Sequence, residues 1–201
     1  KTSADNGNTY AMYIYGYMLR EGDGIAVDKK EAARYFKMSA DKGNTSAMNN
    51  YGLMLYNGDG IPMNKKEAAK YFKLSADKGN TNAMNNYGFM LHEGDGIPID
   101  MKEAIKYIKL SADQGNTNAM YIYGNTLYMG DDVPVDKVGA ARYFKMSADQ
   151  GNADSMYMYG LMLYEGEGTH MDRSTALHYL QNAADQGNAE AMATIQQLTA
   201  D

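Results

Sequence analysis

The chain has 201 residues, a formal net charge of −6, 44% apolar residues and 22% charged residues. These proportions are those of a folded protein and exclude an intrinsically disordered polymer. The sequence contains no cysteine, which excludes disulfides, thiolate metal sites and cysteine nucleophiles.

The composition also bears on partners and compartment. No apolar stretch approaches the roughly 18 consecutive residues of a membrane span, so we expect no membrane insertion. No signal peptide is visible, and the lack of cysteine is compatible with a reducing compartment, which favours the cytoplasm. Lysine and arginine form no basic run along the sequence, so we expect no nucleic-acid partner.

One tract dominates the organisation of the chain. The residues Ser-Ala-Asp-Lys-Gly-Asn at 39–44 return every 36 residues, in tracts that start at Ser3, Ser39, Ser75, Ser111, Ser147 and Ala183. Self-similarity at a period of 20–50 residues is typical of a stacked repeat array. We therefore predict a single array, with residues 1–7 as the tail of a preceding repeat. It continues with five full repeats, at 8–43, 44–79, 80–115, 116–151 and 152–187, and a terminal half-repeat helix at 188–201.

The second repeat serves as the template for a first helix. Asn44 is a good N-cap, because its side chain can accept a hydrogen bond from free backbone N–H groups. After it, Ala47, Met48, Tyr51, Gly52 and Leu55 fall on one face of an α-helix. The sequence Gly-Asp-Gly at 58–60 ends this helix, because glycine accepts the left-handed conformation. We interpret the aspartate between the glycines as stabilising its own turn.

A second helix follows in the same repeat. Asn64 and Glu67 have the spacing of a capping box, in which each side chain satisfies the backbone donor of the other residue. Asp28 with Glu31 and Asp100 with Glu103 repeat the pairing. The short connections predict an antiparallel helical hairpin in every repeat. An aspartate, such as Asp41, ends each second helix, where the macrodipole disfavours an anion, so we expect it to have a local hydrogen bond.

Two later regions depart from the template. In the fourth repeat, Asp132 replaces a loop glycine and Gly139 replaces the capping-box glutamate, so we expect this hairpin to be locally weaker. After Asn188, Ile195 and Gln196 replace the usual tyrosine and glycine of a first helix. A polar last helix is what a terminal cap requires, although an arbitrary chain end would read the same way.

These patterns carry a family resemblance over essentially the whole chain. The pattern A-M-x-x-Y-G-x-x-L, then G-D-G-I-P, then A-x-x-Y-F-x-x-S-A-D-x-G-N resembles the Sel-one-like repeat (SLR) family, relatives of tetratricopeptide repeats. The resemblance implies an all-α fold, a right-handed α-α superhelix or solenoid, with the first helix of each repeat on the concave side. It also implies work as an adaptor or scaffold for protein complexes. Some secreted members of the family carry a cysteine pair in every repeat, and a hydrolase activity has been proposed for them. This chain lacks those cysteines.

Candidates for chemistry are few. His92, His170 and His178 occupy three different repeat positions, and no pair has the spacing of helical metal ligands. The Gly-Asp-Gly loops have too few oxygen ligands for calcium and do not lead directly into a helix, as a phosphate loop would. The recurring methionines, such as Met48, are typical of core packing. We therefore expect no catalytic residue, no metal and no cofactor.

The variable positions of the first helices are the better candidates for binding. They combine aromatic rings, which are enriched at interface hot spots, with amides that can pair with an extended peptide. We expect an amide-lined centre between aromatic walls, which binds a protein or peptide partner. The predicted contacts are Tyr13, Tyr17, Asn49, Leu53, Tyr56, Asn85, Phe89, His92, Tyr121, Asn125, Tyr128, Tyr157 and Tyr164.

Two alternatives stay open at this stage. An exposed N-terminal edge could stack on another array, which would make the chain a structural element that self-associates end to end. A hydrolase built on the repeats is the third reading, although no nucleophile–base pair is visible in the sequence.

Overall fold

A computed structural model describes residues 1–200, with side chains up to Leu198, and every regular element in that range is an α-helix. The helices divide into two compact units, residues 1–107 and 108–201. The first unit contains α1 (Thr2–Asp5), α2 (Thr9–Glu21), α3 (Lys29–Asp41), α4 (Thr45–Asn57), α5 (Lys65–Asp77), α6 (Thr81–Glu93) and the start of α7 (Met101–Asp113). The second contains the end of α7, then α8 (Thr117–Met129), α9 (Lys137–Ala148), α10 (Ala153–Glu165), α11 (Arg173–Asp185) and α12 (Ala189–Ala200).

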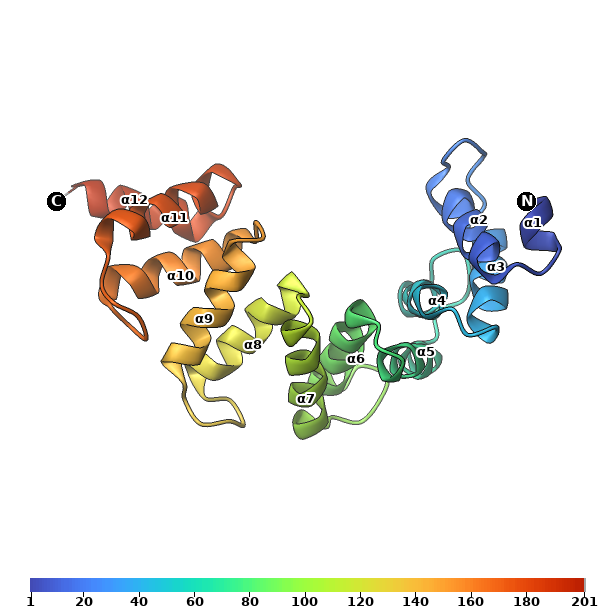
Figure 1. The fold of residues 1–201 in the computed structure, drawn as a ribbon, viewed down its shortest axis with the longest axis horizontal. Helices are drawn as coiled ribbons and strands as arrows, with labels where there is room; N and C mark the ends of the chain where they lie inside the picture. Colours follow the sequence, from blue (N-terminus) through green and yellow to red (C-terminus); the bar gives the residue numbers. More distant parts are fainter. Residues whose placement is uncertain (201) are drawn as a thin grey trace. The chain divides into compact units, whose positions relative to one another are not determined.

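The fold is an all-α solenoid of 36-residue hairpins, as the sequence predicts (Figure 1). Each first helix starts at an asparagine cap. In α4, the Asn44 side chain accepts a hydrogen bond from the Ala47 N–H at 2.8 Å, and Gly58 ends the helix with a left-handed φ of 70°. The same asparagine cap precedes α2, α6, α8 and α10. The predicted helix bounds are therefore confirmed.

The capping box forms only in half. At the start of α5, the Glu67 N–H donates to Asn64 Oδ1 at 3.0 Å, as predicted. The return bond is absent, because the Asn64 N–H instead donates to the carbonyl oxygen of Leu55 at 2.8 Å. Equivalent backbone bonds from the cap residue to a first-helix leucine precede α3, α7, α9 and α11. Because this bond satisfies the cap, Gly139 can replace the glutamate and α9 still begins at Lys137.

A glycine lets the two helices of a hairpin approach closely. A Cβ atom added at Gly52 in α4 would lie 2.7 Å from Phe72 Cε1 in α5, which is too close for real atoms. Next to this contact, the rings of Tyr51 and Tyr71 meet edge to face with centroids 4.8 Å apart. Four further repeats hold the same T-shaped tyrosine pair. Small residues packed against large ones in this way form a hydrophobic core between the helices of the stacked hairpins.

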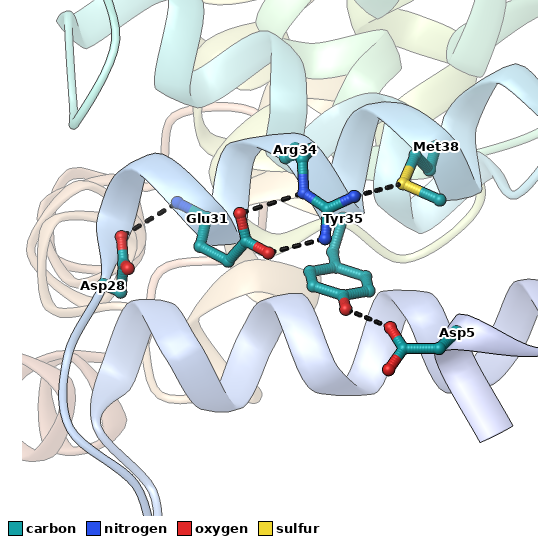
Figure 2. A network of polar contacts seen from close by, with 6 residues as sticks. All are labelled: Asp5, Asp28, Glu31, Arg34, Tyr35 and Met38. Atoms are coloured by element: carbon teal, nitrogen blue, oxygen red, sulfur yellow. Dashed lines mark hydrogen bonds and ion pairs between the residues drawn. The ribbon is translucent and has the colours of Figure 1, made fainter. Parts of the chain in front are cut away.

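Hydrogen bonds join successive repeats 30 positions apart. Ser75 Oγ donates to the Thr45 carbonyl oxygen at 2.7 Å, and Tyr107 Oη donates to Asp77 at 2.5 Å. Tyr35 donates to Asp5 in the same way (Figure 2). The aspartate that ends a second helix also has the local hydrogen bond that we expected, because Lys37 Nζ donates to Asp41 at 2.8 Å and Lys73 Nζ donates to Asp77 at 2.9 Å. The tyrosine of the next repeat is an additional partner that the sequence did not predict.

The fourth repeat holds its loop at a conformational cost. Asp132 has a φ of 56°, whereas glycines occupy the equivalent left-handed positions in the other repeats, including Gly60 and Gly96. A residue with a Cβ atom is disfavoured in this region of backbone space. This strain agrees with the expectation of a locally weaker hairpin.

Candidate partner-binding surface

Polar side chains connect the first helices of the first unit. Arg20 of α2 donates to Asn50 Oδ1 of α4 at 2.7 Å, and Asn86 Nδ2 of α6 donates to Asn49 Oδ1 of α4 at 3.0 Å. Asn49 is 7% exposed, so its amide joins two helices instead of lining the surface, and we omit it from the candidate surface. Asn86, which the sequence analysis did not single out, takes part because it lies on the helix face toward α4.

A small apolar hollow opens between α4 and α6. Its volume is about 90 Å³, and its lining brings together three predicted residues with three that the sequence reasoning missed. The Phe89 ring is 42% exposed at its edge. The lining residues are Leu53, Tyr56, Phe72, Asn86, Phe89 and Met90. Phe72 and Met90 read as core positions in the sequence, and both are buried, so no surface signal could have found them.

The remaining predicted residues of the first unit lie apart from this hollow. Tyr17 is 42% exposed on α2, and the Arg20 guanidinium lies 5.3 Å from its ring centroid. Tyr13 is half-buried, with its ring 6.0 Å from that of Phe36 in the same hairpin. His92 is exposed and contacts its neighbour Glu93.

Asn85 on α6 holds an unusual amide. Its Oδ1 atom is buried and accepts no hydrogen bond from the residues that the structure describes. The sequence prediction placed this amide at the centre of the binding surface, between aromatic walls.

The predicted residues of the second unit are all half-buried. Tyr121 packs with its ring 6.0 Å from Phe144, and Tyr157 packs against the small core around Met156. Asn125 lies on the same helix as Tyr121, one turn further on. The Arg173 guanidinium covers the ring of Tyr164 at 5.0 Å.

Two predicted tyrosines belong to ion-pair clusters that join repeats. Tyr56 donates to Asp95 Oδ2 at 2.6 Å, and Lys65 Nζ lies 2.8 Å from both oxygens of Asp95. In the fifth repeat Glu167 replaces this aspartate and accepts hydrogen bonds from Tyr128 at 2.7 Å and from Lys137 at 2.5 Å. Asp95 therefore bonds the preceding repeat, as Asp59 does through Lys29 at 2.8 Å, and for these two loops our interpretation that the aspartate stabilises its own turn is wrong.

These clusters shift the protonation of their members. The Lys65 ammonium, followed by the Tyr56 hydroxyl, lowers the pKa of Asp95, and the hydrogen bond to Asp95 raises the pKa of Tyr56. Lys137 and Tyr128 lower the pKa of Glu167 in the same way. Each carboxylate is thus held ionised, which suits an ion pair that fixes a loop. A general acid would need the opposite shift.

The surface offers several features that suit the binding of a partner. Within the described residues, no group of three or more histidine, cysteine or acidic side chains could hold a metal ion. No described helix has the length and apolar character that a membrane crossing requires. Exposed rings, a hollow and amides support recognition by complementary contact.

Comparison with known proteins gives the chain its family. A family model for the Sel1 repeat matches residues 9–44, 45–80, 81–116, 117–152 and 153–188, each one residue later than the boundaries predicted above. No curated protein sequence matches this chain.

Solved structures agree with this match. A Sel1 repeat protein from Oxalobacter formigenes superposes with a TM-score of 0.89 at 31% identity, over 97% of this chain and 80% of that one. The c5321 protein, a protective antigen of uropathogenic Escherichia coli with an SLR fold, gives a TM-score of 0.87 at 29% identity. This chain is covered over 94% of its length in that comparison and spans 40% of c5321.

An immunity protein from Pseudomonas aeruginosa, Pa5087, shares the fold at 20% identity, over 91% of this chain and 67% of that one, with a TM-score of 0.59. The repeat matches cover most of the sequence, and the 36-residue hairpins of the structure have the same period. The chain belongs to the Sel1 repeat family.

Proposed function

We propose that this protein is a non-enzymatic adaptor that binds a peptide segment or partner protein on the face formed by its first helices. Sel1 repeats typically serve as protein-interaction scaffolds and are generally non-catalytic. The observation that carries the proposal is the apolar hollow between α4 and α6, with Phe89 open at its edge. An exposed aromatic ring beside an apolar depression is the usual form of an interface anchor.

The predicted residues differ in how much of each side chain remains available to contact a partner. The hydroxyl groups of Tyr56 and Tyr128 donate to carboxylates of the chain itself. The ring of Tyr164 lies under the Arg173 guanidinium. Phe89 and Tyr17, each 42% exposed, are the most exposed phenylalanine and tyrosine residues of the predicted set. We therefore centre the proposed surface on the first unit and on these two rings, and leave the half-buried Tyr13, Asn85, Tyr121, Asn125 and Tyr157 as secondary contacts.

A peptide selection tests the proposal. Peptides would be selected from a random displayed library on the whole chain, and their affinities measured by fluorescence polarisation for the chain and for Phe89→Ser. We expect the substitution to weaken binding by roughly tenfold or more, as the loss of an interface anchor does. Leu177→Ser is the matched control, because Leu177 is 41% exposed but lies on the second helix α11.

The outcomes are separable. Equal losses in both variants, or selected peptides that bind Phe89→Ser normally, would contradict the proposed surface. Thermal melting of both variants shows whether either change acts through unfolding, since Phe89 is not part of the buried core. A mass that rises with protein concentration would instead favour the structural, self-associating alternative.

A further inference from the structure

The second helices of the first unit concentrate positive charge on a face that the proposed function does not use. Of the 14 lysines and arginines in residues 1–107, 10 lie in second helices. Lysine and arginine form no basic run along the sequence, but the fold places most of those in the first unit on its second helices. Residues 1–107 contain 14 basic and 13 acidic residues, net +1, whereas residues 108–201 contain 5 and 12, net −7.

Several acidic groups on this face are already paired with basic residues of the same helix. Glu31 holds Arg34 through two hydrogen bonds of 2.9 and 2.5 Å (Figure 2). Asp41 pairs with Lys37 at 2.8 Å. On the next helix, Asp77 pairs with Lys73 at 2.9 Å and also accepts the Tyr107 hydroxyl.

Four exposed lysines on the second helices of the first unit have neither a charged nor an aromatic partner among the described residues, whereas Lys106 on α7 lies over the Tyr107 ring at 5.4 Å. Each of α3 and α5 carries four basic and two acidic residues, so an excess of cations is left over. The unpaired ammonium groups form no hydrogen bond or ion pair with the residues that the structure describes. They are Lys30 on α3, Lys66 and Lys70 on α5, and Lys102 at the start of α7.

The surface around these lysines is hollowed and partly apolar. Lys30 borders a depression of about 530 Å³ whose lining includes Ala33, Tyr51 and Ile61. Lys66 and Lys70 border a second depression of about 330 Å³ beside Tyr71 and Leu74. The Leu74 side chain is 51% exposed. Cations over an apolar floor offer two kinds of contact at once.

We propose that this second-helix face, defined by Lys30, Lys66, Lys70 and Lys102, binds an acidic peptide segment that also carries apolar side chains. Charge complementarity selects the acidic partner, and the unpaired lysines can accept its carboxylates without breaking an internal ion pair. A uniform polyanion fits less well, because it has no apolar side chains to contact Ile61 and Leu74 in these depressions.

The probe is a short fluorescent peptide that repeats Glu-Glu-Leu, titrated with the intact chain. We expect saturable binding that weakens as salt is added, because the contacts lie at the surface. Lys66→Glu with Lys70→Glu should weaken binding by roughly tenfold, as charge reversal at a docking surface does. Lys42→Glu with Lys78→Glu is the matched control, because these exposed lysines follow the second helices and the net charge changes by the same amount.

Further arms decide the class of partner. Peptides that repeat Gln-Gln-Leu or Glu-Glu-Ser should bind more weakly, because each lacks one of the two contacts. The proposal is overturned if either binds as well, if the control pair loses as much affinity, or if no binding is found. Tighter binding to oligothymidine or to phosphatidylserine vesicles would also overturn the proposal. So would self-association through this face, seen as a mass that rises with protein concentration in the unmodified chain but not in Lys66→Glu with Lys70→Glu. Phe89→Ser should leave Glu-Glu-Leu binding unchanged, so failure here is distinguishable from failure of the first-helix surface.

Discussion

Tyr107 donates its phenolic hydrogen to Asp77, 30 positions earlier in the chain, at a distance of 2.5 Å. Lys73 lies 2.9 Å from the other oxygen of the same carboxylate and 3.2 Å from the tyrosine oxygen. The bond joins α5 to α7, so two second helices of consecutive repeats share one charge. The Tyr107 hydroxyl, followed by Lys73, lowers the pKa of Asp77.

Tyr107→Phe should lower the free energy of unfolding by about 1 kcal/mol, because it removes one hydrogen bond to a partly exposed carboxylate. The chain supplies its own control in Tyr71, which has the same edge-to-face tyrosine partner but donates to no described carboxylate. Tyr71→Phe should cost clearly less. Urea denaturation followed by circular dichroism measures both values, and equal losses would show that the Asp77 bond contributes nothing.

Acid should weaken the same joint. The folded-state pKa of Asp77 lies below its ordinary value, so the stabilisation is present at neutral pH, above the unfolded pKa. It is lost as the pH falls through the folded one. Asp77→Asn should therefore flatten the decrease in melting temperature below about pH 4, the ordinary aspartate range. Asp23→Asn, which removes a carboxylate without a described partner, should leave that slope unchanged.

Gly52→Ala should be strongly destabilising. The added methyl would lie 2.7 Å from the Phe72 ring, and overpacking of this kind typically costs about 1–3 kcal/mol. Asn57→Ala at the exposed end of α4 should have little effect. Combining Gly52→Ala with Phe72→Leu should recover part of the loss, because leucine lacks the ring atoms Cε1 and Cζ that the added methyl would meet. Strictly additive effects would contradict a direct contact.

Asp132→Gly should stabilise the protein by about 1 kcal/mol, because glycine adopts the φ of 56° without strain. The reverse change at the equivalent position, Gly96→Asp, should cost more than this. Its Cβ would lie 2.5 Å from that of Lys65, so the loop would have to move. Melting temperatures of the two variants test the pair, and a neutral Asp132→Gly would mean that the strain is relieved elsewhere.

Asp100→Ala should cost about 1 kcal/mol of stability, because its side chain caps the Glu103 N–H at 3.0 Å. Glu103→Ala should cost much less. The backbone bond from the Asp100 N–H to Leu91 already satisfies the cap that the glutamate would serve. Chemical denaturation measures the loss of stability in both variants. A similar loss in both would indicate that the Glu103 side chain also caps the helix, as a full capping box requires.

The sequence predicted the helices because their signals are local. The asparagine caps, the glycine stops and the apolar faces of α4 and α5 all depend on residues within one hairpin. The capping box was half wrong because its competitor, the Leu55 carbonyl, belongs to the preceding helix. Local spacing contains no information about that acceptor.

The candidate surfaces were harder to predict because they depend on contacts between repeats. Asn49 read as a surface amide, but the donor that buries it, Asn86, lies 37 positions away. Tyr56 read as a free ring, but Asp95 of the next loop accepts its hydroxyl. The excess of unpaired lysines on α3 and α5 was invisible for the same reason. Which cations are neutralised is decided by packing, and net charge gives no sign of it.

The bond between each cap N–H and a first-helix carbonyl has a practical consequence. It leaves the side chain at the third position of every second helix without a role in satisfying the cap N–H, and that position accordingly holds Glu31, Glu67, Glu103, Gly139 or Thr175. The helix start depends on this backbone bond and on the side chain of the cap residue, and any substitution other than proline at the third position leaves both in place. Each repeat therefore offers one place where a charge or a spectroscopic label can be exchanged at the edge of the lysine-bearing face while the helix still begins at the same residue.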